Sequence, residues 1–245
     1  MNKLRRLLAS NARRGSFRAE GDTLYIYDVI VASDDDAEWL GGVSAETIVK
    51  QIRSMSGPIT LRINSPGGDV FAARAVQAAM DSHDGEIVAH VDGYAASAAS
   101  LIAVVADRCV MAPGAFMMIH KAWTIGMGNA DDMLATAEVL EKIDGTLAET
   151  YAAKTGSKPE EYADLMRAET WFTAQEALDA RLADEITAKT PKAEAAWDLT
   201  AYGTAPAADA AIEPEPQPEL EPEPDSSEQI ARARLHALRM RQVTA

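Results

Sequence analysis

A serine near the middle of the chain stands where an activated nucleophile could form. Ser97 follows an apolar run that ends at Gly93, and it precedes a run of very small residues that predicts a helix. A serine at such a strand-to-helix junction lies beside the unpaired backbone N–H groups of the first helical turn. Those groups can stabilise negative charge that develops when the hydroxyl attacks a carbonyl. Most serines at helix starts only cap the helix, so a catalytic role for Ser97 requires partners.

A glycine-containing turn is the first possible partner. Residues 65–68 read Ser-Pro-Gly-Gly and follow a short apolar strand. The proline fixes the entry to the turn, and the glycines permit a backbone conformation and a close approach that a Cβ would prevent. An N–H group of this turn could be one donor of an oxyanion hole, with the amide of Ala98 as the other. An ordinary tight turn is the alternative interpretation.

The second partner is a histidine, because a serine nucleophile needs a base. His83 lies in a polar loop, His236 lies near the C-terminus, and His90 lies in a strand before the serine. Only His120 combines the end of an apolar strand with a loop expected at a cleft. His120 is therefore the candidate general base.

The third partner is a carboxylate that would orient the imidazole. Glu169 stands just before an aromatic pair, Trp171 and Phe172, that should anchor it to the core. Asp144 and Asp184 compete for the same role. Spacing alone leaves the choice among the three open.

Strands and helices alternate through the part of the chain that carries these residues. The capping box that begins at Thr173 predicts one short helix after the others. The alternation predicts an α/β fold with repeated strand–helix units. Strands are expected at 24–31, 59–63, 86–91, 108–111 and 115–119, and helices at 44–55, 70–80, after Ser97, at 130–153 and at 159–167.

The two ends differ from the body in composition, and this predicts four parts. Residues 1–20 carry six basic side chains and one acidic side chain and are expected to form a basic flexible arm. Residues 21–190 are the expected folded domain. Residues 191–228 are rich in Ala, Pro and Glu, which predicts a disordered linker. Residues 229–245 are expected to form a short basic helical tail that is marginal alone.

The charge and the hydropathy exclude several classes of partner. The net charge is −15, and residues 21–187 carry 11 basic and 27 acidic side chains. A body this acidic argues against nucleic acid as a partner. The longest small or apolar run, 94–106, is too short to span a bilayer, and no signal peptide is expected. The single Cys109 fits a reducing compartment, so we expect a cytoplasmic protein with no membrane partner, no metal and no cofactor.

Together, the motifs between residues 63 and 186 resemble those of the Clp-type serine peptidases, the ClpP family, within the crotonase-like superfamily. The resemblance implies a ClpP/crotonase-like fold of repeated ββα units and a serine endopeptidase. It also implies that Ser97 is the nucleophile and His120 the base, with amides of Gly68 and Ala98 as the oxyanion hole. The third triad position falls on Glu169, where housekeeping members usually carry Asp. The matching stretches are 63–68, 93–100, 118–120 and 172–177.

The residues of these motifs are most similar to those of the phage and prophage branch, the ClpP-related head-maturation proteases. A basic arm and an acidic linker with a basic tail also fit a protein that works inside an assembling procapsid. The expected partners are polypeptide substrates, possible scaffold or capsid proteins among them, and further copies of the chain in a ring. In the resembling family the segment that corresponds to helix 130–153 joins rings face to face. A need for an ATPase unfoldase is left open.

Four alternatives remain beside this interpretation. One is a housekeeping-type Clp proteolytic subunit that works with an ATP-dependent unfoldase. Another is a crotonase-like enzyme, because the same fold can stabilise a thioester enolate without a serine and a histidine base. A third is a Ser–Lys peptidase with Lys121 or Lys142 as the base, although such enzymes usually carry a membrane anchor. The fourth is mainly an assembly or scaffold factor, and the serine endopeptidase is favoured over all four.

Overall fold

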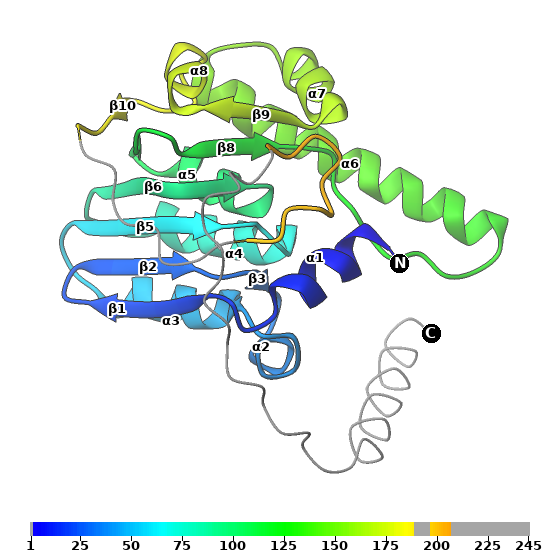
Figure 1. The fold of residues 1–245 in the computed structure, drawn as a ribbon, viewed down its shortest axis with the longest axis horizontal. Coiled ribbons are helices and arrows are strands. Elements are labelled where there is room, and N and C mark those ends of the chain that lie inside the picture. The colour runs from blue at the N-terminus through cyan, green and yellow to red at the C-terminus, as the bar shows by residue number, and fades with distance from the viewer. Residues whose placement is uncertain (1, 189–196, 207–245) are drawn as a thin grey trace. The chain divides into compact units, whose positions relative to one another are not determined.

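The computed structural model describes residues 2–188 and 197–206, which belong to one compact unit, 1–206 (Figure 1). Its helices are α1 (Lys3–Asn11), α2 (Asp34–Leu40), α3 (Ala45–Ser54), α4 (Val70–Asp81), α5 (Ala98–Val105), α6 (Ala130–Thr155), α7 (Pro159–Ala168) and α8 (Ala174–Asp179). Its strands are β1 (Ser16–Glu20), β2 (Thr23–Tyr27), β3 (Ile30–Val31), β4 (Val43–Ser44), β5 (Ile59–Ser65), β6 (Ile87–Ala96), β7 (Arg108–Met111), β8 (Phe116–Ile119), β9 (Thr170–Thr173) and β10 (Glu185–Ile186).

The main sheet divides at β6. Its strand order is β1-β2-β5-β6-β7-β10, and β8 also pairs with β6 and then with β9. The first half of β6 pairs in parallel with β7, whereas residues Tyr94–Ala96 pair in parallel with β8. The carboxyl end of β6 is therefore held between β5 and β8, and the chain leaves this end through Ser97.

The predicted α/β fold is confirmed, and most predicted elements are present. Helices α3, α4 and α5 pack one against the next, and α5 packs on β6. Ser44 caps α3 by accepting from the Thr47 amide, and the predicted capping box of α8 joins Thr173 and Glu176 in both directions. Buried and half-buried residues alternate along β5 and the first part of β6, so one face of these strands is covered more completely than the other.

The strand before the nucleophile is longer than predicted. The sequence predicts a strand at 86–91, an apolar run that stops at Gly93 and a run of small residues with helical character directly after it. Instead, β6 continues to Ala96, because Tyr94–Ala96 find backbone partners in β8, and α5 begins only at Ala98. Ser97 thus lies alone between a strand and a helix.

The N-terminal region differs from the expected flexible arm. Residues Lys3–Asn11 form α1, and Ser16–Glu20 pair antiparallel with β2 as the edge strand. The basic side chains occupy the exposed side of α1, while Leu7 is only 2% exposed. The apolar positions of this segment therefore dock on the body even though its net charge is strongly positive.

Residues 197–206 also differ from the expected linker, 191–228. Trp197, Leu199 and Tyr202 are buried in a second apolar cluster that includes Leu7 of α1. The side chain of Asn11 binds both the N–H and the C=O of Asp198, at 2.7 Å and 2.9 Å. In Figure 1 this segment, drawn in orange, runs past the carboxyl end of β5 next to α1. The rest of the expected linker and the expected tail, 229–245, lie outside the described residues.

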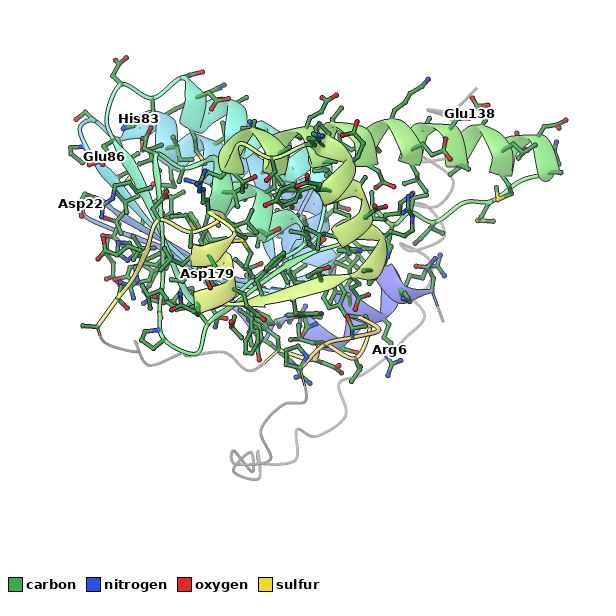
Figure 2. All side chains as sticks on the ribbon, turned by 90° about the horizontal axis from the view of Figure 1, so that it is seen from above. Arg6, Asp22, His83, Glu86, Glu138 and Asp179 are labelled. Carbon is green, nitrogen blue, oxygen red and sulfur yellow. The ribbon has the colours of Figure 1, made fainter. Side chains whose placement is uncertain are left out.

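Helix α6 extends well beyond the sheet. Figure 2 shows its outer part around Glu138 far from the strands. Leu134 and Val139 on this part are 65% and 52% exposed, which is unusual for aliphatic side chains. No helix within 2–188 and 197–206 is long and apolar enough to cross a membrane. The same residues include no group of three or more His, Cys, Asp or Glu side chains that could hold a metal ion.

Candidate active site

Ser97 occupies a strained turn between β6 and α5. Its φ and ψ angles are 53° and −122°, a combination that residues with a Cβ rarely adopt. Such strain costs about 1–3 kcal/mol and persists only where the surrounding structure imposes it. Here the Ser97 N–H donates to the Met118 carbonyl at 2.9 Å, and its side chain makes no capping bond to the helix. The turn therefore presents the hydroxyl instead of using it as a cap.

His120 lies within hydrogen-bond distance of this hydroxyl. Its Nε2 atom is 2.8 Å from Ser97 Oγ, because β8 carries His120 just past its last residue and runs beside the end of β6. Burial lowers the pKa of His120 to about 4, although the Glu169 carboxylate opposes this change. The imidazole is therefore neutral at neutral pH, which is the form that can accept a proton from a serine.

The glycine turn packs directly against the nucleophile junction. A Cβ on Gly67 would lie 2.5 Å from the Ala96 carbonyl oxygen and 2.8 Å from the Ser97 Cβ, so only glycine permits this approach. Gly68 has a φ of 150°, and a Cβ there would lie 1.9 Å from the Ile30 carbonyl oxygen. The two backbone segments therefore meet without side chains between them.

The amides on either side of Gly68 are already bonded. The Gly67 N–H donates to Ser65 Oγ at 3.1 Å, and the Asp69 N–H donates to the Ile30 carbonyl at 2.8 Å. Within the described part of the chain, the Gly68 N–H has no acceptor. Ala98 begins α5, where a helix leaves its first amides without intrahelical acceptors. The predicted donors are therefore an amide of the turn whose Gly67 packs against Ser97 and the amide that directly follows Ser97.

Glu169 lies near His120 but is bonded elsewhere. It caps the end of α7 in a left-handed conformation, and its carboxylate accepts from the Thr204 N–H at 2.7 Å. Burial alone would raise the pKa of Glu169, but hydrogen bonds from Gly203 and Thr204 lower it below the usual value. His120 Nδ1 is buried and has no hydrogen-bond partner among residues 2–188 and 197–206. Ser97, His120 and Glu169 are thus close together, but no hydrogen bond joins His120 Nδ1 to the Glu169 carboxylate in the structure.

The competing carboxylates are engaged in other contacts. Asp144 on α6 accepts from the Ala122 N–H at 2.8 Å and lies 3.3 Å from the ammonium group of Lys121. Asp184 accepts from the Cys109 N–H and from Lys154, both at 2.7 Å. Of the three candidates, Glu169 is the one whose charge acts on His120.

The neighbouring serines have structural partners. Ser65 is fully buried, and its hydroxyl donates to the Asp28 carbonyl at 2.6 Å. Ser100 donates to the Ser97 carbonyl at 2.6 Å and lies 2.8 Å from the hydroxyl of Tyr151. Among these three serines, only Ser97 has its hydroxyl within hydrogen-bond distance of an imidazole.

Other candidate bases lie elsewhere. His83 contacts the Gly57 carbonyl, and His90 lies in the middle of β6. His236 lies outside the described residues. Lys121 pairs with Asp144, and its side chain is 43% exposed. These contacts favour His120 over the other histidines and over Lys121.

Three aromatic residues of the site were not predicted as parts of it. The Tyr202 ring lies 5.4 Å from the His120 ring, 5.1 Å from the Trp123 ring and 5.8 Å from the Trp171 ring. The sequence does contain a signal for this, since Trp197, Leu199 and Tyr202 are unusual in a segment otherwise suited to disorder. Their spacing before the Pro/Glu-rich stretch could have indicated a docking segment.

Comparisons with known proteins place the chain in a family. The family model described as Clp protease matches residues 27–190. ATP-dependent Clp protease proteolytic subunit 3 of Rhodococcus jostii is 35% identical over 131 residues, which is 52% of this chain and 64% of the relative. Subunit 1 of Protochlamydia amoebophila is 32% identical over 53% of this chain and 65% of its own. Subunit 1 of Leifsonia xyli is 29% identical over 60% and 81%.

The chain therefore spans just under two thirds of the length of the first two relatives. Among solved structures, a ClpP1 mutant from Listeria monocytogenes matches with a TM-score of 0.58 and 22% identity, over 68% of this chain and 91% of the other. At this identity the match establishes the fold, and it confirms the predicted ClpP-like architecture.

Proposed function

Because the chain belongs to the Clp protease family, we propose that it is a serine endopeptidase whose nucleophile is Ser97. One observation carries the proposal. The Ser97 hydroxyl lies 2.8 Å from a neutral imidazole at a strained strand-to-helix turn. A hydroxyl that only capped a helix would bond to the amides of that helix instead.

In the proposed mechanism, Ser97 Oγ attacks the carbonyl carbon of the scissile peptide bond. His120 Nε2 takes the hydroxyl proton and then gives it to the leaving amine. The negative charge that forms on the carbonyl oxygen is stabilised by the N–H groups of Gly68 and Ala98. Water then hydrolyses the acyl-enzyme by the same route, with His120 again acting as the base.

We assign the orienting role to Glu169. A carboxylate that accepts from His120 Nδ1 fixes the tautomer in which Nε2 is a proton acceptor, and it stabilises the imidazolium that forms. Glu169 lies near enough for its charge to act on His120. In the structure one oxygen of this carboxylate accepts from the Thr204 N–H at 2.7 Å, and a second oxygen remains to accept from His120.

For the biological role we propose maturation of phage heads inside an assembling procapsid, with scaffold or capsid proteins as substrates. The wording of the motifs and the acidic body with basic ends support this role. The second candidate is a housekeeping Clp proteolytic subunit in the cytoplasm, which the printed names of the relatives favour. The two can be separated by measuring cleavage of an unfolded protein with and without a Clp-type ATPase and ATP. Stimulation by ATP would favour the housekeeping role.

We further propose that the chain assembles into a ring-shaped oligomer through α6. Leu134 and Val139 lie exposed on the part of the helix that extends from the body, where a second copy could cover them. Light scattering on the full chain tests this, and a monomer at micromolar concentration would contradict it. Leu134→Asp should reduce the assembled fraction, since a buried charge in such an interface is costly.

Labelling with a fluorophosphonate probe, followed by peptide mapping, tests the proposed activity. We expect an adduct on Ser97, and we expect Ser97→Ala to abolish both labelling and peptide hydrolysis. Ser82→Ala is a matched control, because Ser82 is exposed at the end of α4 and bonds only to the Ala78 carbonyl. An adduct on Ser65 or Ser100 would contradict the assignment.

A further inference from the structure

Residues 197–206 lie over the proposed nucleophile. Tyr202 is only 4% exposed, and its hydroxyl donates to the Pro66 carbonyl at 2.6 Å. Burial raises the pKa of Tyr202, and the nearby Ser97 side chain opposes this rise. The phenol hydroxyl therefore binds the glycine turn and lies near the nucleophile.

This position is the one that a substrate must occupy. A peptide carbonyl that Ser97 attacks has to enter between the hydroxyl and the amide of Gly68. That amide belongs to the same turn as Pro66, whose carbonyl binds the hydroxyl of Tyr202. Tyr202 and a substrate carbonyl cannot occupy this space together.

The ring of Tyr202 fills an aromatic pocket beside the base. Trp123, Trp171 and His120 surround it with ring centroids 5.1–5.8 Å away. Such aromatic pairs stabilise the position of the ring beyond the burial of apolar area. The pocket is open to another occupant only when this ring leaves.

Further contacts hold the two ends of the segment. At its start, Trp197 Nε1 donates to Asn64 Oδ1 at 3.2 Å. Near its end, the N–H and the hydroxyl of Thr204 bind the Glu169 carboxylate at 2.7 Å and 3.0 Å. The segment thus lies over the nucleophile and also binds the candidate acid, while His120 Nδ1 has no partner among the described residues.

We propose that residues 197–206 are an intramolecular ligand of the active site, anchored by Tyr202, that closes the substrate cleft until it is displaced. This inference rests on the proposed peptidase function. The occupied pocket indicates the class of competitor, a peptide that presents an aromatic side chain beside the reacting hydroxyl. The closed state requires no unfolding to open, because the segment adds no strand to the sheet.

The test uses the full chain and measures the rate of fluorophosphonate labelling at Ser97 together with peptide hydrolysis. Tyr202→Ala should raise both rates about tenfold or more, since activity scales with the fraction of open molecules. Tyr202→Phe keeps the ring and removes the hydroxyl, so it should give a smaller increase with the fold retained. Thr200→Ala is the matched control, because Thr200 is exposed on the same segment and bonds only to Asp198. It should leave both rates unchanged.

A synthetic peptide with the sequence of residues 197–206 provides a second measurement. It should inhibit Tyr202→Ala competitively, and the same peptide with alanine in place of tyrosine should not. If both Tyr202 variants fold but are labelled no faster than the unsubstituted protein, the inference is wrong. Labelling of Ser97 would still support the peptidase function in that case. If Ser97 is labelled in no variant, the proposed function fails and the inference fails with it.

Discussion

Two regions of the molecule meet at Ser97, and they are held there in different ways. The ends of β5, β6 and β8 are fixed by sheet hydrogen bonds and by the close approach of Gly67 to the nucleophile turn. Residues 197–206 reach the same place through side-chain contacts, chiefly those of Trp197, Tyr202 and Thr204. The first region supplies chemical groups in a fixed geometry, whereas the second controls access to them.

The difference has an energetic consequence. Disrupting the first region would break the main core, since β5, β6 and β8 all contribute buried strands to it. Each hydrogen bond of the second region contributes only about 0.5–1.5 kcal/mol net. Detaching the segment would also expose Trp197, Leu199 and Tyr202, at about 1.5–3 kcal/mol for each large apolar side chain, but the sheet would stay folded. Substitutions in the two regions should accordingly act in opposite directions, lowering activity in the first and raising it in the second.

The largest effect is expected in the first region at His120. His120→Ala should lower peptide hydrolysis by about 10⁶-fold, as loss of the nucleophile does, because nucleophile and base act as a unit. Lys121→Ala should change the rate little, since Lys121 is paired with Asp144 and half exposed. Steady-state hydrolysis of a short peptide checks both. Equal losses of peptide hydrolysis in the two variants would favour the Ser–Lys mechanism instead.

A smaller effect is expected at Glu169, where the two regions touch. Glu169→Gln should lower hydrolysis by up to about 10⁴-fold, because an amide no longer fixes the tautomer of His120 or stabilises its imidazolium. The same change weakens the hold on Thr204, which should partly offset the loss by opening the cleft. Measuring the substitution again in a Tyr202→Ala background separates these effects, and the loss should be larger there. Asp144→Asn is the matched control, and a greater loss in that variant would reassign the acid.

The chemical groups of the first region could be predicted from sequence because their determinants are local. Ser97, the 65–68 turn and His120 lie at strand ends, and short motifs with definite spacings identify them. Tyr202 could not be predicted in the same way, since its partner Pro66 is 136 residues distant and its segment borders a stretch poor in apolar residues. The end of β6 was misplaced for a related reason, because only pairing with β8 keeps residues Tyr94–Ala96 extended.

The N-terminal helix illustrates the same limit. Charge dominates the composition of residues 1–20, and it predicts a solvated arm. The docking of α1 depends on a few positions, such as Leu7 and Asn11, whose partners lie in residues 197–206. Two segments whose overall compositions predict solvated chain thus stabilise one another. Composition describes each segment alone and carries no information about such mutual contacts.

The pH dependence should distinguish the closed from the open cleft. Near pH 5 the rate, relative to its own plateau at higher pH, should be about tenfold lower for the open form than for the closed form. Burial lowers the pKa of His120 to about 4. The Glu169 carboxylate raises this pKa and the Lys3 ammonium group lowers it, while the neighbouring Tyr202 is buried and uncharged. Removing the Tyr202 ring exposes the imidazole, so its pKa should return towards 6.5. The acid limb of kcat/KM for Tyr202→Ala should therefore lie at higher pH than that of the full chain. Coincident profiles would contradict the burial of His120 by this segment.

The same pKa change affects stability in a defined window. Between pH 6.5 and about 4 the unfolded chain binds a proton at His120 that the closed, folded chain does not bind. The free energy of unfolding of the full chain should therefore fall as the pH drops through this window. In Tyr202→Ala this contribution should shrink, because the folded and unfolded pKa values become similar. Urea denaturation at pH 7 and pH 5 checks this, with His120→Ala as the control that lacks the titrating group.

The smallest effect is expected at the start of the segment. Trp197→Phe removes the N–H donor to Asn64 Oδ1 and keeps most of the buried ring area. Asn64 Oδ1 still accepts from the Tyr94 N–H at 3.1 Å, so the first region should keep its geometry. One net hydrogen bond of about 1 kcal/mol corresponds to about a fivefold change in an equilibrium. Labelling of Ser97 should therefore become about three to five times faster, less than in Tyr202→Ala.

The control for this substitution is Trp39→Phe, because Trp39 on α2 is 46% exposed and should leave labelling unchanged. The sign of the Trp197 effect matters more than its size. Slower labelling would mean that the segment supports the geometry of Ser97, since a loosened support would lower reactivity. Faster labelling would mean that the bond from Trp197 to Asn64 holds a cover in place. The response to the loss of this one hydrogen bond, 3.2 Å long, thus separates a supporting role of residues 197–206 from a closing one.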